Sequence, residues 1–169
     1  MNGLWDRLKN EVKEEMEEGR IVTLVGATLA NVGDEFIFLG ASKKCEECRL
    51  KKSCTNLEVG RRYRIEHVRN EIKHDCYIHE GGVRVVEVIE PPVKVAIEAK
   101  LALKGAKIVF EPVDCEETDY YELFDLCHPL GLKEGDRCTI LDVIGDVPGE
   151  NKILKGQGLK LVEVKRECL

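Results

Sequence analysis

The sequence is poor in aromatic residues, which make up 5% of it and include a single tryptophan. A hydrophobic core must therefore rest mainly on Val, Ile and Leu. No apolar run is long enough to cross a bilayer, so we expect no membrane-spanning helix and no membrane partner. The first residues soon become heavily charged and do not have the pattern of a secretion signal, which favours a cytoplasmic protein.

Common catalytic and nucleotide-binding motifs are also missing. The sequence contains no G-x-G-x-x-G, no P-loop and no G-x-S-x-G, and no Ser/His/Asp or Cys/His set indicates nucleophilic catalysis. It therefore predicts no reaction, and whether the protein is an enzyme stays open. The net charge of −6 argues against a protein that covers nucleic acid with its whole surface.

Cysteine, in contrast, is abundant, with eight residues in the chain. Cys45 and Cys48 form a C-x2-C pair, a spacing that lets two sulfurs reach one ion from a single turn. Cys54 follows as a third ligand from the same loop, and Cys76, in a polar turn, is the best fourth. His74 and His79 could substitute for it. Buried thiols that only pack as small hydrophobes fit badly with the lysines and arginines around them.

Iron–sulfur and zinc centres both remain open for these cysteines. Structural zinc sites usually combine two paired motifs, and this chain has one pair only. Cysteine ligands of iron–sulfur clusters are spaced more variably, which favours an iron–sulfur cluster as the cofactor and zinc as the alternative. Without a metal, Cys54 in its basic loop would be the candidate for a reactive thiol.

The chain also repeats itself, which predicts its fold. Thr23–Phe38 aligns without a gap with Val95–Phe110, and ordered matches continue up to that of Val86–Val88 with Val162–Val164, which indicates an internal duplication. We expect an N-terminal amphipathic helix in residues 1–19, a first β repeat in 20–92 and a second in 93–169. Each repeat would have four strands and a cysteine loop between its second and third strands. The two would form a mainly β, pseudo-twofold barrel or sandwich.

In the second repeat the cysteine pattern is incomplete. Cys115 matches Cys45 and Cys127 matches Cys54, but Thr118 stands where Cys48 would be. Cys115, Cys127 and His128 could form a second, degenerate metal site, or Cys115 or Cys127 could complete the first one. Cys138 replaces a strand tyrosine and is expected to pack in the core.

The basic residues of the first repeat suggest a different class of function. A zinc-stabilised module could bind RNA or a ribonucleoprotein through the basic cysteine loop and the strand after it. The candidate contacts are Arg49, Lys51, Lys52, Arg61, Arg62 and Arg64. In the redox hypothesis the partner would be an electron-transfer protein, and basic residues near the sulfurs would tune the potential.

The same residues carry a resemblance to a known family. Cys45-x2-Cys48-x5-Cys54, followed by Leu57–Tyr63 and later by Leu126–Leu132, resembles uncharacterised archaeal protein family number 179 over nearly the whole chain after the first helix. The resemblance implies an archaeal cytoplasmic protein with two cysteine clusters, described in that family as candidate iron–sulfur redox centres. It implies no established activity or substrate.

Overall fold

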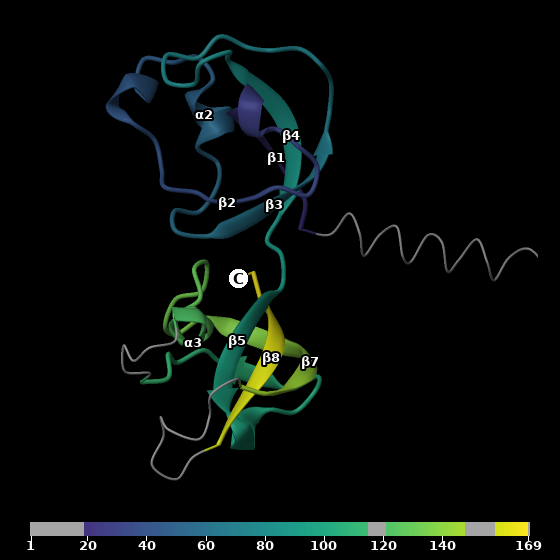
Figure 1. Ribbon diagram of the computed structural model, residues 1–169. Helices are drawn as coiled ribbons and strands as arrows, with labels where there is room; N and C mark the ends of the chain where they lie inside the picture. The colour runs from purple at the N-terminus through teal and green to yellow at the C-terminus, as the bar shows by residue number, and fades with distance from the viewer. Residues whose placement is uncertain (1–18, 115–120, 148–157, 169) are drawn as a thin grey trace, which may run out of the picture. The chain divides into compact units, whose positions relative to one another are not determined.

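The computed structural model of the protein describes residues 19–114, 121–147 and 158–168, and it is built mainly of β-strands (Figure 1). The chain divides into two compact units, Met1–Glu90 and Pro91–Leu169, and each is described by itself. The helix expected in residues 1–19 falls, up to residue 18, outside the described residues.

The first unit is a curled, four-stranded antiparallel sheet with strand order β1-β4-β3-β2 (Figure 1). Its strands have the alternating apolar pattern of half-buried segments, which places one side chain in two toward the core. The register of β3 against β4 shifts between Ile65 and His67, a bulge of the kind that bends a strand. The strands are β1 Ile21–Gly26, β2 Glu35–Ile37, β3 Arg62–Val68 and β4 Val83–Ile89, with a 3-10 helix, η1, at Ala27–Leu29.

The second unit repeats this arrangement, with strand order β5-β8-β7-β6. Its elements are β5 Val93–Glu98, the 3-10 helix η3 Ala99–Leu101, β6 Lys107–Val109, the helix α3 Tyr121–Cys127, β7 Arg137–Asp146 and β8 Leu159–Arg166. The predicted duplication and the mainly β class are thus confirmed. The match with the first repeat also favours a strand over Val95–Leu103. In the structure this strand ends at Glu98, because the chain there enters the same 3-10 turn as in the first unit.

Backbone hydrogen bonds recur at matched positions of the two units. Gly33 N–H donates to the Ile65 carbonyl at 2.8 Å, and Gly105 N–H donates to the Ile140 carbonyl at 2.8 Å. Both glycines have positive φ, 92° and 82°, which side chains other than glycine's rarely adopt. The same turn therefore starts the second strand of each unit. Closure of the two sheets on one another into a single barrel or sandwich stays a prediction.

Each sheet has a core of its own. In the first unit it consists of Ala30, Leu57, Tyr63, Ile65, Val86 and Val88. In the second it consists of Val95, Ile97, Phe110, Cys138, Ile140, Val162 and Val164. The second core contains Cys138 as the sequence predicted. Val, Ile and Leu supply most of both, as expected for a chain with few aromatic residues.

A group of ion pairs on the outer face of β4 should make the stability of the first unit depend on pH. Glu87, with 17% of its side chain exposed, contacts Arg69 Nε at 2.9 Å and Arg20 Nη1 at 3.4 Å. The hydrogen bond from Arg69, reinforced by the charges of nearby basic groups, lowers the Glu87 pKa below its usual 4.5. A lowered pKa adds stability above the unfolded-state pKa, and this is lost as the pH falls through the folded-state value.

We therefore expect the first unit to lose at most about 1 kcal/mol of stability through Glu87 as the pH is lowered below 4.5, since exposed pairs contribute little. A Glu87→Gln variant should have lower stability at pH 7 and a flatter dependence of stability on pH between 5 and 3. Urea unfolding at several pH values measures both. Equal slopes in the variant and the wild type would contradict the assignment.

Candidate metal centre

Three of the candidate cysteines come from a loop built of successive tight turns. The 3-10 helix η2, Lys43–Cys45, begins at Ser42, whose side chain accepts a hydrogen bond from the Lys44 N–H at 3.1 Å. Cys48 N–H then donates to the Cys45 carbonyl at 3.1 Å, closing the C-x2-C turn. The short helix α2, Lys51–Cys54, follows and ends on the third cysteine. These turns keep the three thiols on one compact loop.

The loop is attached to β1 by two side-chain hydrogen bonds. Thr23, buried in β1, donates through Oγ1 to the Ser53 carbonyl at 3.1 Å. Asn56 Nδ2 donates to the Val22 carbonyl at 2.8 Å. Both bonds hold α2 and its last residue, Cys54, against the sheet.

Replacing Thr23 by valine is expected to loosen the loop without disturbing the sheet. Valine has nearly the same shape, and Val95 already occupies the matching position of β5. The loss of one hydrogen bond costs about 1 kcal/mol, so amide exchange of residues 51–55 should be roughly fivefold faster. Hydrogen-exchange mass spectrometry tests this, with Thr23→Ser, which keeps the donor, as control. Unchanged exchange in Thr23→Val would mean that the hydroxyl does not anchor the loop.

Cys76 reaches the site from a second segment. His74 and Val83 exchange two backbone hydrogen bonds of 2.8 Å, so the turn between them is fixed to the start of β4. Within this turn the Cys76 sulfur lies 3.4 Å from the N–H groups of Ile78 and His79, and 3.2 Å from Nδ1 of His79.

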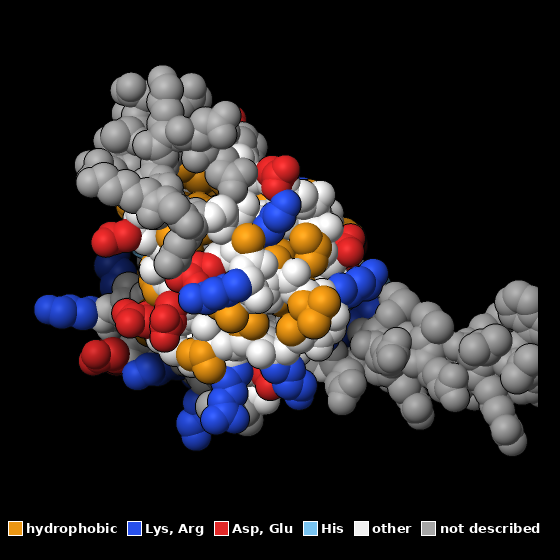
Figure 2. Space-filling view, turned by 90° about the horizontal axis from the view of Figure 1, so that it is seen from below, with side chains coloured by type: hydrophobic (Ala, Val, Ile, Leu, Met, Phe, Trp, Pro, Cys, Tyr) orange, Lys and Arg blue, Asp and Glu red, His pale blue; other side chains and the backbone are white. Residues whose placement is uncertain are grey.

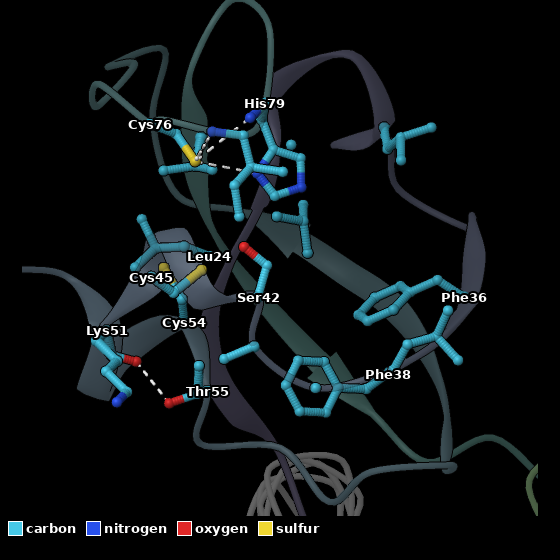
Figure 3. Close-up of a pocket in the computed structure, with 18 of the residues that line it drawn as sticks. Leu24, Phe36, Phe38, Ser42, Cys45, Lys51, Cys54, Thr55, Cys76 and His79 are labelled. Carbon is cyan, nitrogen blue, oxygen red and sulfur yellow. Dashed lines mark hydrogen bonds between the residues drawn. The ribbon is translucent and has the colours of Figure 1, made fainter. Parts of the chain in front are cut away.

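The four thiols line one cavity of about 550 Å³ in the first unit. In Figure 3, Cys45, Cys54 and Cys76 project into it from one side, and Phe36 and Phe38 face it from the other. Cys48 also lines it, and all four cysteines are half-buried. The structure therefore brings together the four residues that the sequence proposed as one ligand set.

The pKa of Cys54 is affected by the other three cysteines of the cavity. Burial is the largest cause that raises the pKa of its thiol to about 11, and the neighbouring Cys48, Cys76 and Cys45 contribute in that order. Like charges oppose each other's ionisation only over short distances. The contribution of the three other cysteines therefore indicates that the four sulfurs lie close enough to repel one another when they are ionised and no cation is bound. A raised pKa also makes Cys54 a poor nucleophile.

The thiols do not converge as they stand. In the described part of the chain, no three or more Cys, His, Asp and Glu side chains are arranged so that they could hold a metal ion. The donor set nevertheless suits a thiophilic metal, because four thiolates are the ligands preferred by zinc and by iron–sulfur clusters. Binding would require the side chains to turn toward one another within the cavity.

The candidate residues of the second unit have different surroundings. Cys127, the last residue of α3, is fully buried with Ala96, Leu123, Val147 and Leu159, and it is disulfide-bonded. A sulfur in a disulfide is not a thiolate, so ligation by Cys127 would require reduction first. Cys115 lies outside the described residues. The structure gathers apolar side chains around Cys127, and a metal role for the pair stays a prediction.

The six basic residues suggested for RNA fall into two groups. Three on or next to β3 are engaged in ion pairs: Arg61 with Glu58 at 2.9 Å, Arg62 with Glu35 at 3.4 Å and Arg64 with Glu66 at 2.7 Å. Arg61 is also only 4% exposed. For Arg49, Lys51 and Lys52, on the cysteine loop, the described residues provide no ion pair. Of the six, this second group is therefore the one whose charges are not paired with acidic side chains of the described residues.

One face of the molecule is mixed in charge. On the face seen in Figure 2, acidic and basic side chains are interspersed with small groups of hydrophobic ones. No helix among the described residues has both the length and the apolar character needed to cross a membrane.

Comparison with known proteins places the chain in an archaeal group. A family model described as "Uncharacterised protein family (UPF0179)" matches residues 21–164. A UPF0179 protein of Pyrococcus abyssi is 46% identical over 148 residues, which cover 87% of this chain and 98% of that protein. One from Methanosarcina barkeri is 42% identical over 143 residues, covering 85% and 94%. One from Archaeoglobus fulgidus is 38% identical over 150 residues, covering 89% and 96%. No solved structure matches.

Proposed function

Since this chain belongs to the uncharacterised protein family UPF0179, we propose from its own site that it is a metal-binding protein. In this proposal Cys45, Cys48, Cys54 and Cys76 hold one iron–sulfur centre, used in electron transfer or in an accessory binding role. The observation that carries the proposal is that two separate segments bring four half-buried thiols to one cavity. The raised pKa of Cys54 supports it, because the other three cysteines contribute to that shift.

Residues around the cavity would have different roles in binding the centre. The four thiolates would be the ligands of the centre. The N–H groups of Ile78 and His79, each 3.4 Å from the Cys76 sulfur, would stabilise negative charge on that sulfur. Lys51, on the cavity wall, would offset part of the remaining charge. When bound, an iron–sulfur centre supplies reversible electron transfer. Because its ligands would be half-buried and would line an open cavity, the centre would be accessible to a protein redox partner.

The redox state of the cysteines bears on the compartment and on the number of centres. A reducing cytoplasm would keep the thiols of the cavity available to a metal. Cys115 and Cys127 would hold a second centre only after the Cys127 disulfide is reduced. One centre per chain is therefore the expected content of the oxidised protein, and a second would be gained under reduction.

Metal and sulfide analysis of the full chain, purified without oxygen, tests the proposal directly. We expect iron with acid-labile sulfide and a broad visible absorption that bleaches on reduction. Zinc in place of iron would overturn the redox role and leave a structural metal site. Protein without metal that also fails to take up iron and sulfide, or zinc, would overturn the metal site itself.

A second candidate is a zinc-stabilised module that binds RNA or a ribonucleoprotein. It is favoured by the exposed Arg49 and Lys52 on the cysteine loop, with Lys51 beside them, which have no ion pair among the described residues. A metal would fix the loop and with it the spacing of these charges. A local basic patch can bind phosphates although the whole chain is acidic.

Reversing Lys51 and Lys52 to glutamate is expected to abolish RNA binding if this second candidate is right. Each lost phosphate contact should also reduce the slope of log affinity against log salt by roughly 0.7 on a single strand. Fluorescence anisotropy with a labelled single-stranded RNA at several salt concentrations measures both. Reversal of Lys94 and Lys165, exposed on the strands of the second unit, is the matched control. Equal loss in both variants would indicate non-specific attraction.

A further inference from the structure

His79 and Cys76 form a contact that the ligand set does not require. Nδ1 of the His79 ring lies 3.2 Å from the Cys76 sulfur, in addition to the backbone N–H of the same histidine at 3.4 Å (Figure 3). A thiolate can only accept hydrogen bonds, so toward an ionised Cys76 the ring must carry its proton on Nδ1. The histidine then holds the sulfur in place from two directions.

Gly26 at the end of β1 provides the room for this ring. A Cβ at position 26 would lie 2.8 Å from Cδ2 of His79, closer than real Cβ contacts. The backbone does not demand glycine there, since φ is −52° and ψ is 134°, values open to any residue. Glu98 occupies the matching place in β5, so the second unit shows that this strand end accepts a side chain. Space for His79 is thus the feature that distinguishes position 26.

We propose that His79 is a positioning residue of the metal centre. It donates from Nδ1 to the Cys76 thiolate and fixes the direction of that ligand, while Gly26 lets the ring lie where this bond can form. The inference rests on the proposed metal-binding function and adds an outer contact to it. Partners of this kind, which orient a ligand without touching the metal, commonly contribute tenfold or more to metal affinity.

Cobalt titration of the reduced, metal-free full chain is the test, because thiolate–cobalt absorption reports both affinity and the number of sulfur ligands. A His79→Leu variant, which cannot donate, should bind Co²⁺ about tenfold more weakly with the charge-transfer intensity of the wild type. His79→Asn, which retains a donor, should recover part of the affinity. His67→Leu, an exposed histidine of β3 outside the cavity wall, should behave as wild type.

A double-mutant cycle tests the role of Gly26. Gly26→Ala should weaken Co²⁺ binding when His79 is present and have little effect in a His79→Ala background, where no ring is displaced. Additive effects, or wild-type affinity in His79→Leu, would overturn the proposal. A changed absorption pattern in His79→Leu would do so too, since it would make His79 a ligand itself. If the wild type binds no Co²⁺, the metal-binding function fails instead.

Discussion

A Cys48→Ser variant is expected to lose its metal. Cys48 closes the C-x2-C turn through its N–H bond to the Cys45 carbonyl and lines the cavity with the other three thiols. A serine hydroxyl fits the same space but remains protonated and is a hard, weak ligand for a thiophilic metal. The loss of affinity should exceed the roughly 100-fold that removal of an outer partner can cost. Metal content per chain and visible absorption, measured on protein purified without oxygen, give the answer.

Two other cysteines supply matched controls for this variant. Cys168 is exposed at the end of the described chain, so Cys168→Ser should retain full metal content. Cys138 is fully buried in the second core, so Cys138→Ser should lower stability through burial of a hydroxyl while leaving the metal in place. Retention of metal and stability in Cys48→Ser would show that the thiols of the cavity only pack.

Much of the fold follows from pattern alone. Val83–Ile89 is rich enough in Val and Ile to indicate β4, and the ungapped match of Thr23–Phe38 with Val95–Phe110 identifies β5 even though its Ala and Lys content suits a helix. Cys76 could be chosen as the fourth thiol because it sits in a polar turn. In each case the deciding information is local or repeated in the sequence.

Other parts of the site depend on contacts between distant segments. The apolar wall of the cavity, with Phe36 and Phe38, forms only when β2 lies opposite the cysteine loop. The anchoring role of Thr23 could have been noticed from its replacement by Val95 in the repeat, but its partner, the Ser53 carbonyl, could not. Arg61 is unavailable to RNA because the surrounding chain buries its side chain, which is only 4% exposed, although its ion-pair partner Glu58 is partly exposed.

Removal of the metal is expected to release the site segments of the first unit while the second unit stays folded. Between Gly40 and Gly60 only Leu57 is buried among the described side chains, so little hydrophobic burial holds the cysteine loop. The hydrogen bonds of Thr23 and Asn56 are each worth about 1 kcal/mol. A bound metal at 100 times its dissociation constant would add about 2.7 kcal/mol of stability, more than either bond.

Hydrogen exchange measured with and without a chelator separates this local effect from a global one. Amides of residues 42–56 and 74–80 should exchange roughly 100-fold faster after chelation, which is the factor that corresponds to the loss of this metal-binding stabilisation. Without the cation, nothing joins the thiols of the two segments. Amides of β7 and β8 should keep their protection, since the second core contains no candidate ligand of the cavity. Equal acceleration in both units would mean that the metal stabilises the whole chain, and no acceleration would mean that the loop holds its conformation without one.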